Sequence, residues 1–188
     1  MNTPEPFAGE PVHTPVRHHI LSVLVENKSG VLARVAGLFA RRGFNIYSLA
    51  VAPAERHARF SRITIVVDAE SAPLEQVVGQ LDKLVNVVDI SDIAPREAVE
   101  RELLLATIPT DVSNRTSLLD ILGLAGASII DVDPGAITVM LAGTPTSCDE
   151  LERALEDHAS VELHRTGRLA VPRLGRDVPP ATSERGPR

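Results

Sequence analysis

Apolar and polar residues follow two different periods along the first third of the chain. Residues 20–25 form an almost continuous apolar run, which predicts a buried strand. After a polar turn at 26–30, apolar residues recur with the spacing of a helix that buries one face. That face comprises Val31, Leu32, Val35, Leu38 and Phe39. Gly43 is expected to end the helix, because glycine adopts a positive φ without strain.

Two strands, a second helix and a further strand are predicted next. Residues 46–52 and 59–67 have strand-like patterns and are joined by a polar connector, which predicts a hairpin with a long loop. Ser71 and Pro73 are suited to open a helix, and residues 85–93 return to an extended pattern. The first half of the chain therefore has the order strand, helix, strand, strand, helix, strand.

The same order recurs more faintly after Pro95. The expected elements begin with a strand at 102–108 and a helix that has Leu118, Ile121, Leu122 and Ala125 on one side and Gly126 as its cap. They continue with strands at 127–133 and 137–142, a helix opened by a capping box of Ser147 and Glu150, and an extended segment at 161–171. Two βαββαβ units of the ferredoxin-like type fit this pattern.

The predicted fold class is α+β, with two ferredoxin-like units. Each unit would carry an antiparallel sheet with two helices on one face, and a partner would cover the other face. A single doubly wound domain is less consistent, because its strands and helices would alternate singly. The units are expected at 18–95 and 96–174, between proline-bearing flexible tails at 1–17 and 175–188.

Composition narrows the class of function. The chain has 25 acidic and 19 basic residues and a net charge of -6, so it lacks the electrostatic footprint of a nucleic-acid-binding protein. One tyrosine, four phenylalanines and no tryptophan leave no aromatic platform for stacking RNA bases. The single cysteine excludes an intramolecular disulfide, and neither a signal peptide nor a membrane-spanning run is recognisable. We expect a cytoplasmic protein.

The sequence contains no recognisable catalytic motif. It lacks a glycine-rich phosphate loop, and its six histidines do not have metal-binding spacing. Cys148 has no motif that links it to a histidine and a carboxylate. Asp131 and Asp133 lie beside a Pro-Gly turn and are interpreted as solvated carboxylates. We expect no catalytic residue, metal or cofactor in this chain.

One group of polar residues suits a small ligand. Asn27, Ser29 and Gly30 lie between the first predicted strand and helix, and Asn45 follows that helix. A helix N-terminus offers unpaired N–H groups and positive potential to a carboxylate, and asparagine both donates and accepts hydrogen bonds. Alternatively, Asn27 and Ser29 merely cap the helix and Asn45 merely relaxes a turn. The residues alone favour neither interpretation.

Several segments closely resemble the small subunits of acetolactate synthase. Residues 20–35, which read ILSVLVENKSGVLARV, carry the most specific similarity. It continues through 37–39, 42–46, 48–53, 61–64, 80–85, 99–103, 130–132, 141–144 and 165–167, so that it spans about 18–174. The resemblance implies an N-terminal ACT domain, which is an amino-acid-sensing module, followed by a second ferredoxin-like domain.

The resemblance also implies where an effector would bind. In that family, ACT domains pair edge to edge between two chains, and the effector valine lies at the seam. Carried over to this sequence, Asn27 and Gly30 of one subunit and Asn45 of the other would hold valine or a related branched-chain amino acid. The full expected site adds Ser29, Val31, Leu32 and Ile46. The resemblance thereby favours the ligand-site interpretation.

The function implied by the resemblance is regulation. The chain would be a non-catalytic homodimer that activates a large catalytic subunit and confers feedback inhibition by valine. Condensation of pyruvate with pyruvate or 2-oxobutanoate would belong to that partner, with thiamine diphosphate, magnesium and FAD. Two alternatives remain: a stand-alone ACT-type regulator of another enzyme or of a transcription factor, and a small ferredoxin-like enzyme.

The second unit departs from the family between Ala106 and Gly126, where apolar residues replace the usual charged ones. Its loop at 109–113 also lacks the asparagine-glycine turn of the first unit. We therefore expect the second unit to bind no effector. It would instead help to hold the chain to the catalytic subunit or to another regulatory chain.

Overall fold

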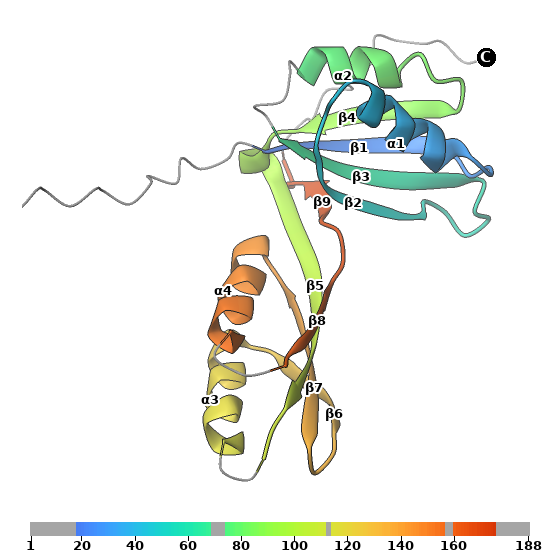
Figure 1. Cartoon of the computed structure of the whole chain (residues 1–188). Helices are drawn as coiled ribbons and strands as arrows, with labels where there is room; N and C mark the ends of the chain where they lie inside the picture. Colours follow the sequence, from blue (N-terminus) through green and yellow to red (C-terminus); the bar gives the residue numbers. More distant parts are fainter. Residues whose placement is uncertain (1–17, 69–73, 112–113, 157–159, 176–188) are drawn as a thin grey trace, which may run out of the picture.

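The chain forms two α+β units placed end to end and joined by one long strand (Figure 1). A computed structural model describes residues 18–68, 74–111, 114–156 and 160–175. The flexible tails expected at 1–17 and 175–188 lie outside the described residues, except for Gly175. Ser71 and Pro73, which were expected to open the second helix, also lie outside them.

The first unit is a four-stranded antiparallel sheet with two helices on one face (Figure 1). Its elements are β1 (His18–Glu26), α1 (Val31–Arg41), β2 (Ile46–Pro53), β3 (Phe60–Asp68), α2 (Leu74–Leu81) and β4 (Val87–Ile93). The strand order is β2-β3-β1-β4, so β2 and β4 are the edge strands. The predicted ferredoxin-like order of elements is confirmed.

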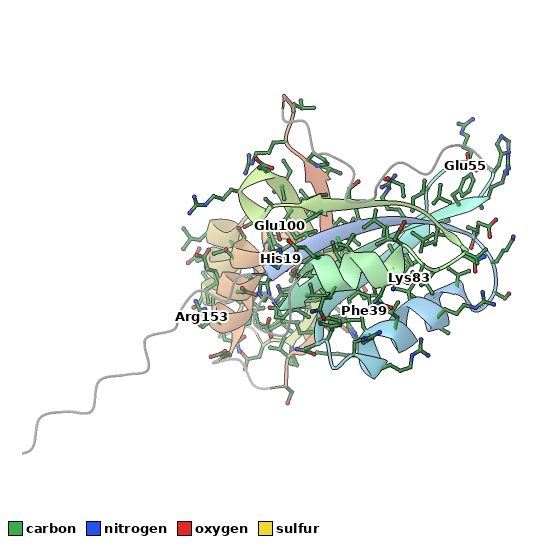
Figure 2. All side chains as sticks on the ribbon, turned by 90° about the horizontal axis from the view of Figure 1, so that it is seen from above. His19, Phe39, Glu55, Lys83, Glu100 and Arg153 are labelled. Carbon is green, nitrogen blue, oxygen red and sulfur yellow. The ribbon has the colours of Figure 1, made fainter. Side chains whose placement is uncertain are left out.

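Alternate residues of the central strands and one face of each helix form the core of this unit. The helical part includes Phe39, labelled in Figure 2, whose ring meets that of Phe44 edge-on. Gly43 has a φ of 71°, as predicted for the residue that ends α1. The last strand of this unit was predicted to begin at Val85, but β4 begins at Val87. The turn after α2 continues up to this residue through backbone hydrogen bonds of 2.9–3.3 Å, one of which joins the Val87 N–H to the Leu84 carbonyl.

The second unit repeats the arrangement with one difference at its end. Its elements are η1 (Pro95–Glu97), β5 (Ala98–Pro109), α3 (Arg115–Ala125), β6 (Ser128–Val132), β7 (Ala136–Gly143), α4 (Pro145–Leu155), β8 (Glu162–Arg165) and β9 (Leu169–Pro172). The sheet order is β6-β7-β5-β8, and β9 pairs with the first part of β5. The single closing segment predicted at 161–171 is therefore wrong, since it forms two short strands.

The predicted start of the last helix is also wrong. The N-cap of α4 is Thr144, whose Oγ1 accepts a hydrogen bond from the Ser147 N–H at 3.1 Å. Proline fits the first helical position, where no backbone N–H is needed, and Pro145 occupies it here. The capping box expected from Ser147 and Glu150 therefore lies one turn inside the helix.

Part of the outer face of the first sheet is covered by the chain itself. Ile20, Val66 and Ile93 form a separate apolar cluster with Ala98 of β5 and Ala170 of β9. The expectation that only a partner covers this face is thus wrong for this region. The reason is that β5 begins at Ala98, four residues before its predicted start, and runs beneath the first sheet before it enters the second (Figure 1).

Candidate effector-binding site

The turn between β1 and α1 leaves the N-terminus of α1 uncapped. Gly30 is the N-cap residue, with a φ of 81°, and no side chain among the described residues caps the helix there. The first turn of α1 contains no acidic residue. The Val31 N–H donates to the Lys28 carbonyl at 3.3 Å. An anionic group can therefore approach the positive end of the helix and the later N–H groups of its first turn across a residue without a side chain.

Asn27 supports this turn and does not cap the helix. Its backbone N–H donates to the Arg59 carbonyl at 2.8 Å, and its side-chain Nδ2 donates to the Ala58 carbonyl at 2.8 Å. Both carbonyls belong to the connector between β2 and β3. The interpretation that Asn27 and Ser29 merely cap α1 is therefore wrong, because Gly30 holds the cap position.

A polar network beside the turn was not recognised in the sequence. Asn86 donates from Nδ2 to Glu26 Oε2 at 2.6 Å and accepts at Oδ1 from Arg34 at 2.8 Å, while Lys28 pairs with Glu26 at 3.0 Å. The hydrogen bond from Asn86, followed by that from Lys28, lowers the pKa of Glu26. These bonds tie the turn to α1 and to the residue before β4. Nothing in the sequence signals them, because Asn86 lies 60 residues after Glu26.

The other predicted ligand residues lie at the far end of α1. Asn45 is exposed, and Ile46 is partly buried against the core at the start of β2. Eleven helical residues separate Gly30 from this end, and such a helix is about 16 Å long. The structure brings Asn27, Ser29, Gly30, Val31 and Leu32 together at one end of α1, with Asn45 and Ile46 at the other. One chain does not bring both groups to a single small ligand.

The strand that begins at Ile46, β2, lies at one edge of the first sheet. It carries two exposed apolar side chains, Tyr47 and Val51, and ends the strand order of the first sheet. An unpaired edge strand presents backbone N–H and carbonyl groups to another strand. Antiparallel pairing of β2 with its copy would bring Asn45 of one chain toward the β2–β3 connector of the other, and Asn27 is bonded to that connector.

The remaining candidate chemical groups have structural surroundings. Cys148 is fully buried in the core of the second unit, and burial raises the pKa of its thiol. Asp133 Oδ1 accepts hydrogen bonds from the N–H groups of Gly135 and Ala136 at 2.6 and 2.7 Å, and Asp131 is exposed. In the part of the chain that the structure describes, no three His, Cys, Asp or Glu side chains are grouped to hold a metal ion. None of the described helices is long and apolar enough to cross a membrane.

The equivalent turn of the second unit is occupied by its own side chains. Asn114 is the N-cap of α3, and its backbone N–H donates to Asp111 Oδ1 at 3.1 Å. The Asn114 side chain accepts from the Asp111 N–H at 3.0 Å and from the hydroxyl of Thr110. A carboxylate of the chain thus binds the N-cap residue of α3, although no described side chain caps the first turn of that helix.

Comparisons with known proteins agree with this division into two units. A family model described as the AHAS small subunit-like ACT domain matches residues 21–89. A second, described as the small subunit of acetolactate synthase, matches residues 101–174.

Individual proteins show the same similarity over nearly the whole chain. An acetolactate synthase small subunit from Mycobacterium bovis is 45% identical over 160 residues, which cover 85% of this chain and 95% of that protein. One from Mycolicibacterium smegmatis is 42% identical over 170 residues, covering 90% and 96% respectively. The crystal structure of the acetolactate synthase small subunit from Thermotoga maritima is 34% identical, with a TM-score of 0.78, and the match covers 86% of this chain and all of that one.

Proposed function

Because the chain belongs to the family of acetolactate synthase small subunits, we propose that it is a regulatory subunit that binds valine or a related branched-chain amino acid. It would activate a separate, large catalytic subunit and make that subunit sensitive to feedback inhibition. Catalysis, with thiamine diphosphate, magnesium and FAD, belongs in this proposal to the large subunit and not to the present chain.

The uncapped N-terminus of α1 is the observation that carries the proposal. Gly30 leaves space in front of the first N–H groups, since nothing lies within 4 Å of the position where a Cβ would be. An amino-acid carboxylate placed there would accept hydrogen bonds from these N–H groups and meet the positive end of the helix dipole. The exposed side chain of Leu32 would offer an apolar contact on the same turn.

The ligand's remaining contacts would come from a second chain. Two chains related by a two-fold axis through β2 would place Asn45 and Ile46 of each beside Asn27 and Gly30 of the other. An asparagine side chain accepts from an ammonium group and donates to a carboxylate, so Asn45 would recognise the zwitterion without adding net charge. This arrangement supplies one effector site per chain and makes binding dependent on the dimer.

Regulation follows if the effector binds two states of the holoenzyme with different affinity. One conformation would support the catalytic subunit, and the other would be favoured by valine. Couplings of about 1–3 kcal/mol, or roughly 5–150-fold in affinity, are typical of such systems. The same coupling would make the catalytic subunit alter the affinity of the chain for valine.

Reconstitution tests the proposal directly. The full chain is mixed with its catalytic subunit, and acetolactate formation is measured with and without valine. We expect the chain to raise the activity and valine to lower it again. A failure to alter activity under both conditions would contradict the proposal. Retained valine binding without co-purification of the two subunits would instead favour a stand-alone amino-acid-binding regulator.

A further inference from the structure

The two units also meet where the segment 166–168, between β8 and β9, lies against the edge strand β2. The backbone N–H of Arg168 donates to Ser48 Oγ at 2.7 Å. The guanidinium carbon of Arg168 lies 4.8 Å from the centroid of the Tyr47 ring, which is the distance of a cation–π contact. Both contacts involve the part of β2 that follows directly after Ile46.

Gly167 makes the crossing close. A Cβ at this position would lie 2.6 Å from the carbonyl carbon of Leu49 and would overlap its oxygen. Only a glycine therefore allows the segment to approach the β2 backbone this closely. Because close-packed groups transmit displacement and do not absorb it, a movement of β2 here would push directly on the segment.

An ion-pair network that is buried at Glu102 and Arg168 and partly exposed at Asp149 continues from the crossing into the second unit. Arg168 Nε donates to Glu102 Oε1 at 2.8 Å, and Glu102 is only 4% exposed. Figure 2 labels Glu100, on the same strand, which lies 3.4 Å from Arg168. Glu102 also binds Arg165, which reaches Asp149 of α4 at 2.7 Å.

The partners of Arg165 hold its guanidinium group in the charged form. Burial alone would lower the pKa of Arg165, but its hydrogen bonds to Asp149 and Glu102 outweigh burial and raise it. A permanently charged group that is nearly enclosed keeps its partners close, because separating them leaves a buried charge unpaired. The path from β2 to α4 therefore consists of contiguous, strongly held contacts.

The strand at the other end of this path is locally irregular. The pairing of β2 with β3 shifts between Ile46 and Ser48, so Tyr47 lies in a β-bulge. A hollow of about 370 Å³ beside it is lined by residues of both units, among them Leu49 and Thr166. The bulge makes the start of β2 the irregular part of this strand, and the hollow lies directly beside the crossing.

We propose that Ser48, Gly167 and Arg168 are positioning residues that transmit effector binding to the second unit. This inference rests on the proposed function, which places the effector against Asn45 and Ile46 at the start of β2. Ordering of these two residues shifts the bulge at Tyr47. Arg168 and Gly167 move with this part of β2, because Arg168 is hydrogen-bonded to Ser48 and Gly167 is packed against Leu49. The ion-pair network then carries the shift to α4.

Two substitutions separate transmission from binding. Gly167→Ala forces the segment away from β2, and Ser48→Ala removes only the hydroxyl that accepts from Arg168. The matched controls are Gly123→Ala, at a glycine of α3 where an added Cβ would meet nothing within 4 Å, and Ser128→Ala, at an exposed serine of β6. For each full-length variant, calorimetry measures valine affinity, and the reconstituted holoenzyme gives activity with and without saturating valine.

We expect Gly167→Ala and Ser48→Ala to bind valine within about twofold of wild type, because neither residue contacts the effector. The ratio of activities without and with saturating valine should fall toward one in Gly167→Ala and should fall by less in Ser48→Ala. Both controls should keep the wild-type ratio.

Different experimental outcomes would contradict the proposed function and the present inference. Absence of valine binding by the wild-type chain would overturn the proposed function and this inference together. Wild-type inhibition in Ser48→Ala and in folded Gly167→Ala would overturn this inference alone. Parallel loss of binding and inhibition in Ser48→Ala would show that the contact is merely structural and would also overturn it.

Discussion

The two units share one order of elements but differ in the turn that precedes their first helix. In the first unit, Gly30 leaves the N-terminus of α1 without a side-chain cap. In the second, Asp111 places its own carboxylate at the start of α3, where it accepts the Asn114 N–H. No described side chain caps either helix, but a carboxylate of the chain binds the N-cap residue only in the second copy of the fold.

This difference teaches that a repeated fold need not repeat a site. A helix N-terminus attracts a carboxylate from whichever source is nearest. When the chain supplies that carboxylate, a ligand must displace an existing hydrogen bond, and when it does not, the ligand fills an unmet requirement. This difference between the turns supports the proposal that the first unit binds the effector and the second unit receives its signal.

The largest expected effect comes from adding a carboxylate to the open turn. Gly30→Asp should weaken valine binding at least about 100-fold, or roughly 3 kcal/mol, because it places bulk and negative charge where the ligand carboxylate belongs. Gly126→Asp is the matched control, since Gly126 in the second unit also has a positive φ, 71°, and open space around it. Calorimetry should show near wild-type affinity for the control. Equal losses in both variants would remove the distinction between the units.

A second substitution tests whether the stability of the second unit is independent of valine binding by the first unit. Arg165→Ala removes a partner of the buried Glu102 carboxylate and should lower the free energy of unfolding by about 2–3 kcal/mol. The control is Arg153→Ala, an exposed arginine of α4 labelled in Figure 2. Urea unfolding followed by circular dichroism suits this chain, which has no tryptophan. A simultaneous loss of valine affinity would show that the two units do not divide these roles.

A smaller effect is expected from the asparagines of the two turns. Asn27→Ala should weaken valine binding by about fivefold to tenfold, because it removes a ligand hydrogen bond and the support given to Ala58. Asn114→Ala, in the equivalent turn of the second unit, should change the affinity by less than about twofold. Calorimetric titration with valine measures the affinity of both variants. Wild-type affinity in Asn27→Ala would exclude Asn27 from the site.

The smallest expected effect concerns Asp92, a carboxylate of the first sheet. Unlike Glu102, it has no arginine partner among the described residues. Burial raises the pKa of Asp92, against the opposing influence of His19, and no described atom bonds its Oδ1. A raised pKa means that the folded chain holds this proton more tightly, so stability is lost as pH rises from the ordinary carboxyl pKa.

Asp92→Asn should therefore raise the free energy of unfolding at pH 7, by less than about 1 kcal/mol, and should leave it unchanged near pH 3. Glu102→Gln should act in the opposite direction at pH 7, because Glu102 has two guanidinium partners. Urea titrations at the two pH values measure both signs. A destabilised Asp92→Asn variant at pH 7 would contradict the assignment.

Most of the fold was predictable because its signals are local. The period-two run of β1, the helical spacing of α1 and the glycine at its end each depend on neighbouring residues. The split between β8 and β9 was not predictable, because it depends on contacts of Gly167 and Arg168 with β2, about 120 residues earlier in the chain. The packing of β5 and β9 against the outer face of the first sheet was not predicted, for the same reason.

The candidate site was predictable only in part. Residue types identified the turn around Gly30, and the resemblance to a family supplied the pairing with Asn45 of a second chain. Sequence reasoning missed Asn86 and Arg34, whose hydrogen bonds join residues 52 positions apart. Neither spacing nor propensity encodes such a contact, and it therefore required the folded chain.

Complementation between two defective chains tests the central claim most directly. Gly30→Asp and Asn45→Ala each damage both sites of a homodimer, but a mixed dimer regains one intact site from Asn27 and Gly30 of one chain and Asn45 of the other. After the variants are unfolded together and refolded at equal ratio, calorimetry should recover about a quarter of the wild-type valine sites, because half of the dimers are mixed. Each variant alone should show no valine site of wild-type affinity. No recovery in a mixture shown to contain mixed dimers, or wild-type binding by Asn45→Ala alone, would contradict an effector site shared between two first units.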